Sequence, residues 1–223
     1  MATKRDHKTY LNYFRRWDGA GMLGILLMAY GFLCLWLGRS LASYIQTVLF
    51  IPVGIAVYLY GSIGRATEAD FTNDIERQME RINFRGIDEE PRFRRRVPKE
   101  PKEQCFSGFS IRPGVLLKRR KSGELCSSEY ICAKMLTLTD AYYIKCVTFS
   151  FVSDERREEI HEICFDQLEE TSIERTSETV TVGKKNLLAK TCMLCLTYNG
   201  GQKVMLPVKD DIYAEEFAAS FRK

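Results

Sequence analysis

Two long uncharged segments dominate the pattern of apolar and polar positions along this chain. Gly19–Gly38 and Ser40–Gly64 contain no Asp, Glu, Lys or Arg, and only Arg39 separates them. Crossing a hydrocarbon core of roughly 30 Å takes about 20 apolar residues in a helix. The pattern therefore predicts a hairpin of two transmembrane helices over residues 19–64.

Basic residues flank this hairpin on the side of both chain ends. They are Lys4, Arg5, Lys8, Arg15 and Arg16 before it, and Arg65, Arg77 and Arg81 after it. Lys and Arg next to a membrane span are retained on the cytoplasmic side. We therefore expect a multi-pass protein of the cytoplasmic (inner) membrane with both termini in the cytoplasm. Residues 1–18 form a basic, aromatic arm, either a helix in the headgroup region or a disordered segment.

Small residues recur every seven positions within the two spans. With Arg39 at the centre of the turn, Gly24 lies opposite Gly54, and Gly31 lies opposite Thr47. Small residues at matching depths let helix backbones approach closely in a membrane. We expect the helices to pack at these four positions; the alternative is glycine scattered as is common in membrane helices.

The polar–apolar pattern changes after the hairpin. Apolar residues at a helical period (Phe71, Ile75, Met79, Ile82) predict an amphipathic helix within residues 65–86. This helix either continues the second span or docks on the downstream domain. Residues 87–104 hold three prolines and dense mixed charge, which predicts an extended linker.

From Cys105 the apolar period becomes two, which is typical of β-strands. We expect about seven antiparallel strands and a C-terminal helix in residues 105–223. Asn199-Gly200-Gly201 predicts a hairpin turn, because Asn and Gly tolerate positive φ. The residues flanking the turn alternate toward one face: Cys192, Leu194, Leu196 and Tyr198 before it, and Val204, Leu206 and Val208 after it. The closing segment 210–223 has the apolar stripe of an amphipathic helix.

Charge and cysteine content narrow the function classes. The chain has 223 residues and a formal charge of +4, yet residues 65–223 hold 27 basic and 27 acidic side chains. A neutral domain argues against capture of nucleic acid, which needs a basic face. The eight cysteines are expected to be free thiols, because the cytoplasmic side is reducing.

Three stretches of the β region resemble a known domain type. Gly114–Lys121, Leu136–Ile144 and Ile163–Leu168 are similar to passages of pleckstrin-homology-like (PH-like) domains in their bacterial or GRAM-type form. The resemblance covers about Cys105–Lys223. It implies a membrane α-hairpin joined to a mainly-β PH-like cytoplasmic domain, and it implies a fold rather than an activity. Eukaryotic members usually carry a Trp in the closing helix, where this chain has Phe217.

The resemblance also indicates a candidate binding site. In pleckstrin-homology domains the turn between the first two strands binds lipid phosphates, and here that turn carries Lys118, Arg119, Arg120 and Lys121. Lys184 and Lys185 would extend such a site toward an anionic headgroup. The alternative is an ordinary solvated turn.

Metal binding and catalysis find little support in the chain. His161-x-x-Cys164 and Cys192-x-x-Cys195 imitate a zinc set, but residues three apart in a strand point to opposite faces. We therefore expect core packing at these positions, no metal and no cofactor. The only histidines are His7 and His161, with no nucleophile partner and no Gly-rich phosphate loop, so no enzyme is expected.

These patterns together predict a membrane-anchored interaction module. Its PH-like domain would bind a protein partner or a lipid headgroup at the inner face of the bilayer, without nucleic acid. Two alternatives stay open. In the first, the hairpin itself acts on the membrane, as in holin-like or inclusion-membrane proteins. In the second, the chain is an accessory subunit of a transport or secretion complex.

Overall fold

The computed structural model describes residues 4–16, 19–38, 40–120, 123–182, 185–208, 215 and 218. For residues 4–6, 88 and 185 it describes the backbone alone. The chain divides into two compact units, Met1–Glu68 and Ala69–Lys223.

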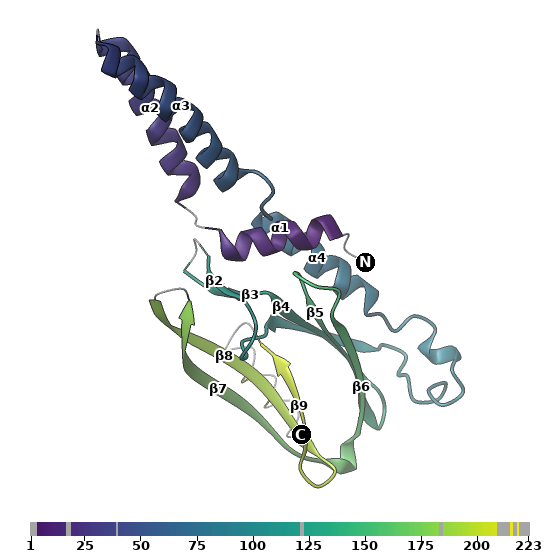
Figure 1. The fold of residues 1–223 in the computed structure, drawn as a ribbon. Coiled ribbons are helices and arrows are strands. Elements are labelled where there is room, and N and C mark those ends of the chain that lie inside the picture. Colours follow the sequence, from purple (N-terminus) through teal and green to yellow (C-terminus); the bar gives the residue numbers. More distant parts are fainter. Residues whose placement is uncertain are drawn as a thin grey trace. The chain divides into compact units, whose positions relative to one another are not determined.

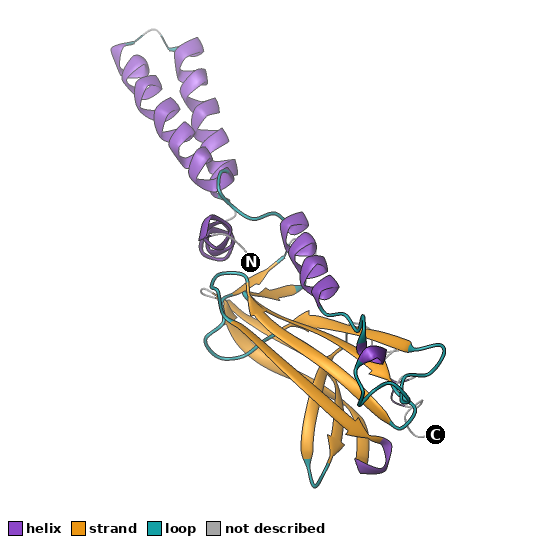
Figure 2. Ribbon diagram, turned by 90° about the vertical axis from the view of Figure 1, so that its right-hand side faces the viewer, coloured by secondary structure: helices purple, strands orange, loops and turns teal. Residues whose placement is uncertain are grey.

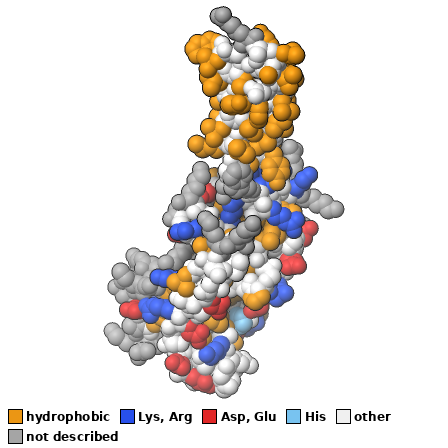
Figure 3. Space-filling view, turned by 60° about the vertical axis from the view of Figure 1, so that its left-hand side comes forward, with side chains coloured by type: hydrophobic (Ala, Val, Ile, Leu, Met, Phe, Trp, Pro, Cys, Tyr) orange, Lys and Arg blue, Asp and Glu red, His pale blue; other side chains and the backbone are white. Residues whose placement is uncertain are grey.

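The described residues of the first unit form three helices: α1 (Lys4–Arg15), α2 (Ala20–Leu37) and α3 (Leu41–Ser62). The last two contain 18 and 22 residues and are long and apolar enough to cross a membrane. Their apolar side chains are exposed on the surface of the unit, where they form an almost uninterrupted hydrophobic coat (Figure 3). In water such a coat would be costly, whereas hydrocarbon would solvate it.

The helices α2 and α3 lie side by side along their small residues (Figures 1 and 2). A Cβ atom added to Gly24 would lie 2.4 Å from the backbone nitrogen of Tyr58 and 2.7 Å from the carbonyl oxygen of Gly54. About two helical turns further along α2, the Thr47 hydroxyl donates to the carbonyl oxygen of Gly31 across the interface at 3.1 Å. The four small residues are buried between the helices.

Hydrogen bonds tie α1 to the last turn of α3. The Asn12 side-chain amide donates to the Gly64 carbonyl at 2.8 Å, and the Arg16 guanidinium donates to the carbonyls of Tyr60 and Ile63 at 2.6 and 2.9 Å. Arg16 also lies 4.5 Å above the centre of the Tyr60 ring. A cation at the C-terminal end of a helix satisfies carbonyls that lack partners and complements the helix dipole.

The second unit is a mainly antiparallel β domain. Its strands are β1 (Lys102–Phe109), β2 (Leu117–Arg119), β3 (Leu125–Ser127), β4 (Glu129–Thr137), β5 (Ala141–Ser150), β6 (Arg156–Cys164), β7 (Leu168–Val182), β8 (Lys185–Tyr198) and β9 (Gln202–Pro207), with short 3-10 helices η1 (Ile87–Glu89) and η2 (Phe165–Gln167). One sheet has the order β1-β4-β5-β6 and another the order β7-β8-β9, while β2 and β3 pair with each other. The described residues thus form nine strands where about seven were expected, and β2 and β3 are short strands within the β1–β4 connection.

The two larger sheets enclose the main core (Figure 1). The predicted alternation around the β8–β9 hairpin is confirmed: Leu194, Leu196, Tyr198, Val204 and Leu206 face this core, and Val208 packs against it. The turn itself has positive φ at Asn199, Gly200 and Gly201. At the far end of the hairpin, β9 closes against β1. A Cβ added to Gly108 would lie 2.8 Å from the Cβ of Pro207, so the two strands touch where glycine leaves room.

The outer face of the four-stranded sheet is covered by α4 (Glu68–Arg81) and by residues 82–97 (Figures 1 and 2). Phe71 of α4 is fully buried, with its ring 4.7 Å from that of Phe151. The amphipathic helix therefore docks on the domain. Phe93 is also fully buried, 4.9 Å from the ring of Tyr143.

This packing differs from the extended linker predicted for residues 87–104. Residues 84–97 pack on the sheet through Phe84, Ile87, Phe93 and Val97, and β1 already begins at Lys102. The reason is that β4 and β5 carry apolar side chains on both faces, with Met135 inward and Leu136 outward. An outward Leu136 or Tyr143 needs cover, and the nearby Phe and Ile residues provide it.

Most of the predicted C-terminal helix lies outside the described residues, Phe217 included. Residues 215 and 218 are helical, and Ala218 belongs to the main core. The Glu215 carboxylate pairs with Arg175 of β7 at 2.6 Å.

The first prediction concerns the hairpin interface. Gly24→Leu or Gly54→Leu should push the helices apart, because the new side chain meets backbone atoms that cannot rotate away. Overpacking of this kind costs about 1–3 kcal/mol or more. We expect rapid proteolysis of the detergent-solubilised protein and lower folded yield. Ala56→Leu, at an exposed position of α3, is the size-matched control, and equal protease resistance of all three variants would contradict the close packing.

Candidate functional site

The basic loop predicted to contact lipid lies on β2 and just after it. Lys118 is only 8% exposed, so its side chain is directed into the domain. Arg119 is exposed, and its Nε donates to the Gly123 carbonyl at 3.0 Å. Lys121 and Lys184 lie outside the described residues, as does the side chain of Lys185. Of the described basic residues in this set, Arg119 is therefore the one most open to solvent.

Arg120 packs against an aromatic cluster formed by Phe71, Phe109, Tyr130, Phe149 and Phe151. Its guanidinium carbon lies 5.0 Å from the ring centre of Phe109 and 5.7 Å from that of Phe71. Its Nε is buried without a hydrogen-bond partner in the described part of the chain. Arg120 thus holds α4 and the end of β1 together by cation–π contact, which leaves it poorly placed to bind a phosphate.

A second arginine of the β1–β4 connection forms a bidentate pair. Arg112 donates through Nε and Nη2 to the two carboxylate oxygens of Glu129, each at 2.6 Å. Glu129 begins β4 and is 7% exposed. Its pKa is held below the ordinary value, first by the Arg112 hydrogen bonds and also by Ser110, although burial opposes the shift. The pair fixes the connection to the sheet at the point where β4 starts.

Sequence reasoning did not single out Arg112 or Glu129. Their separation of 17 residues carries no helical or strand period, and the loop between them gave no signal that would bring them together. The adjacent run Lys118–Lys121 drew attention because its charges are contiguous, yet contiguous charges on a strand point to opposite faces. The structure accordingly places neighbouring members of this run in different surroundings.

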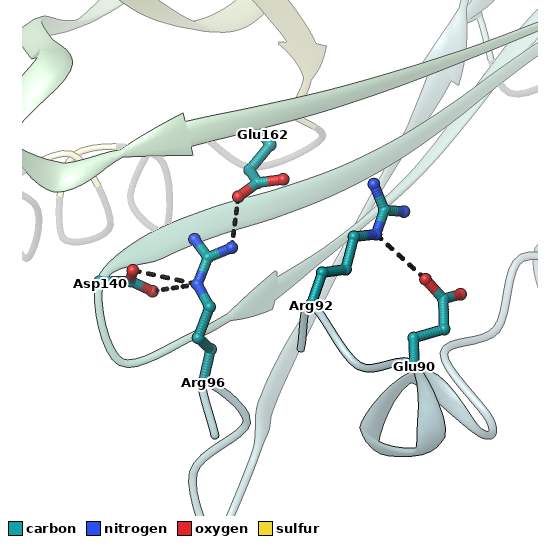
Figure 4. Close-up of polar contacts among 5 residues, drawn as sticks. All are labelled: Glu90, Arg92, Arg96, Asp140 and Glu162. Carbon is teal, nitrogen blue, oxygen red and sulfur yellow. Dashed lines mark hydrogen bonds and ion pairs between the residues drawn. The ribbon is translucent and has the colours of Figure 1, made fainter. Parts of the chain in front are cut away.

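A third set of charges fastens residues 84–97 to the sheet (Figure 4). Arg96 Nε donates to both carboxylate oxygens of Asp140 at 2.7 and 3.0 Å, and its Nη1 donates to Glu162 at 2.6 Å. These bonds raise the pKa of Arg96 above its ordinary value. The backbone adds a further bond, from the Thr139 amide to the Arg96 carbonyl at 2.8 Å. Arg96 therefore joins three segments: its own, the β4–β5 turn and β6.

Arg92 lies beside this set and anchors the same segment. Its Nε is 3.1 Å from the Glu90 carboxylate (Figure 4), and its guanidinium carbon lies 4.3 Å from the ring centre of Phe93. The guanidinium thus contributes to the complete burial of the Phe93 ring. Arg96 therefore attaches the segment to the sheet through Asp140 and Glu162, and Arg92 reaches the sheet at the Tyr143 ring, 6.0 Å from its centre.

The histidine and cysteine positions that imitate a zinc set are dispersed. His161 lies on β6, with Nδ1 3.4 Å from the Tyr198 hydroxyl and Nε2 3.5 Å from the Glu159 carboxylate. Cys195 is fully buried on β8, and burial raises its pKa. Burial also raises the pKa of the Cys146 thiol to about 12, which keeps that thiol protonated. Among the residues that the structure describes, no three His, Cys, Asp or Glu side chains gather as a metal site.

The second prediction tests the Arg96 attachment. Arg96→Leu should loosen residues 84–97, because two charge-assisted hydrogen-bond partners are lost at a half-exposed position. We expect a local cost of about 1–2 kcal/mol, equal to roughly tenfold faster amide exchange in this segment. Hydrogen exchange with mass spectrometry measures it. Arg94→Leu, at an exposed neighbour, is the control; similar exchange in both variants would refute the attachment.

The third prediction concerns the pH dependence of stability. Glu129 has a lower pKa folded than unfolded, so its contribution is complete above the unfolded value of about 4.3 and is lost as pH falls through the lower folded value. Glu129→Gln should destabilise the domain by about 1–2 kcal/mol at pH 7 and show a smaller deficit below about pH 4. Thermal unfolding followed by circular dichroism between pH 7 and pH 3 measures this. Glu124→Gln, exposed in the same loop, should behave as wild type; a deficit that stays constant with pH would contradict the assignment.

Comparison with known proteins adds no assignment to this geometry. No protein-family model matches the chain, and neither a curated protein nor a solved structure is significantly similar to it.

Proposed function

We propose that this chain is a membrane-anchored interaction module without catalytic activity. The hairpin α2–α3 inserts into the inner membrane with both termini in the cytoplasm, and the β domain binds a protein partner or a lipid headgroup at that membrane face. One observation carries the proposal: a helical pair coated with exposed apolar side chains is joined to a separate domain whose apolar residues are packed inside. A lipid-facing part and a water-facing part are thus combined in one chain.

The strand arrangement supports a PH-like identity for the second unit. A four-stranded antiparallel sheet precedes a three-stranded one in the chain, and the first and last strands meet at Gly108 and Pro207. Helical residues follow the last strand, with Ala218 in the core. These features match the two-sheet arrangement with a closing helix that the sequence resemblance implies.

Between the two ligand classes, the geometry favours a protein partner. Lys118 is buried and Arg120 is engaged by aromatic rings, so two of the four contiguous cations are not available to a phosphate. Lipid contact is retained as a second proposal, through Arg119 with Lys121, Lys184 and Lys185. Each cation near an anionic leaflet would contribute about 1 kcal/mol.

The fourth prediction tests the proposed division of labour in the full-length chain. The protein should sediment with membranes and leave them only in detergent, and a reporter fused after Lys223 should be active on the cytoplasmic side. Replacing α2–α3 by an unrelated two-span hairpin should preserve cross-linking to the partner, because recognition belongs to the β domain. Arg119→Glu in the same assay reports on the contribution of anionic lipid.

Two results would overturn this proposal. The first is a protein that stays in the supernatant without detergent, or a reporter active only on the outer side. The second is a loss of membrane potential on overexpression that disappears when the hairpin is exchanged, which would make the hairpin the active part, as in holin-like proteins.

A further inference from the structure

The β domain carries a groove whose named walls, apart from Phe109, take no part in the contacts described above. Its volume is about 200 Å³, and it lies between the end of β1 and one face of the β7–β8–β9 sheet. Its apolar walls include Phe109, Ile131, Met193 and Met205, and its polar walls include Glu178 and Thr191. On β8 the groove residue Met193 alternates with the core residue Leu194, and on β4 Ile131 lies two residues before the core residue Ala133.

We propose that this groove binds a single basic side chain, lysine or arginine, presented by a protein partner. The inference rests on the proposed function, because it names the contact through which the domain would recognise that partner. Three features of the groove favour this occupant: its size, its apolar lining and the one acidic side chain in its wall.

The size of the groove fits a side chain better than a separate metabolite. Pockets that enclose small organic ligands usually measure about 300–1,000 Å³, which exceeds the 200 Å³ found here. A lysine or arginine has a long apolar stem that packs on hydrophobic surface while its charged end stays near water or a counter-ion. The thioethers of Met193 and Met205 are flexible and polarizable, and therefore adapt to such a stem.

Glu178 supplies the charge that selects a cation. It is exposed at the groove, and within the described part of the chain it has neither an ion-pair nor a hydrogen-bond partner. Glu174, four residues earlier on the same face of β7, is instead paired with Lys203 at 3.3 Å. Of these two carboxylates, Glu178 is the one that an incoming cation would neutralise.

The same features argue against other occupants. A metal ion needs several oxygen, nitrogen or sulfur ligands, and the groove offers one carboxylate among apolar walls and hydroxyls. An anionic or purely apolar ligand would leave Glu178 unpaired beside it, with no gain from the charge. A basic side chain is the occupant that satisfies both the apolar walls and the acid.

The fifth prediction follows from this proposal and uses the full-length chain in detergent micelles with ¹³C-methyl methionine. The probes are the capped pentapeptides Gly-Gly-X-Gly-Gly, with X as arginine, lysine, glutamate or norleucine. The arginine and lysine peptides should shift the methyl signals of Met193 and Met205 saturably, whereas the glutamate peptide should not. The two signals are assigned from Met193→Leu and Met205→Leu.

Paired variants on β7 separate the charge from general surface effects. Glu178→Gln should weaken arginine-peptide binding about fivefold, as expected for one partly exposed ion pair, while Glu174→Gln should leave it unchanged. Absence of a saturable shift, equal binding of the norleucine peptide, or equal weakening by both variants would each overturn the proposal. Loss of groove binding while the partner still cross-links would refute this groove alone and leave the proposed function in place.

Discussion

Burial of both faces of the four-stranded sheet is the constraint on which the β domain depends. Its central strands carry apolar side chains in consecutive positions, with Met135 directed to the main core and Leu136 to the outside. A two-layer domain covers one face of such a sheet and would leave the other in water. The chain resolves this with α4 and residues 84–97, which form a third layer built largely from aromatic side chains. Removing that layer would expose Tyr143, Leu136 and Leu138 together.

The hairpin depends on a different constraint. In the bilayer proposed above, burial of apolar surface would not drive the two helices together. Close approach has to come from small residues, and each of Gly24 and Gly54 leaves the partner's backbone within contact distance. Among the described residues, two polar contacts cross the interface: the Cys34 thiol donates to the Gln46 side-chain oxygen at 3.5 Å, and the Thr47 hydroxyl donates to the Gly31 carbonyl. The Thr47 hydroxyl also bonds within its own helix to the Ser43 carbonyl. The Thr47 hydroxyl therefore keeps a hydrogen-bond acceptor whether or not the helices separate. The interface depends mainly on the close packing of the two helix surfaces.

The sequence predicted the parts of this structure that follow from local periodicity. The two uncharged stretches form the helices α2 and α3, and the region in which apolar residues alternate forms the strands. Asn199-Gly200-Gly201 forms a turn with positive φ. The covering segment 84–97 was not predictable in the same way. Its apolar residues are widely spaced among prolines and charges, and what fixes them is the sheet they meet. Leu136 and Tyr143 are the residues that need this cover, and they follow the covering segment by about 40 positions or more. The periodicity of apolar residues carries no information about contacts at that separation.

The candidate site shows the same limit for charge. Lys118, Arg119 and Arg120 are adjacent and chemically alike, yet one is buried, one is exposed and one stacks on aromatic rings. The residue type determines which contacts a cationic side chain is able to make. The alternation of the strand and the neighbouring layer determine which of these contacts it makes in the fold. The β region has equal numbers of acidic and basic residues, so a partner cannot be attracted by net charge. Recognition by a neutral domain has to use those charged side chains that have no ion-pair partner within the fold. The position of each such charge, on a groove or on a loop, then determines which kind of partner the domain selects.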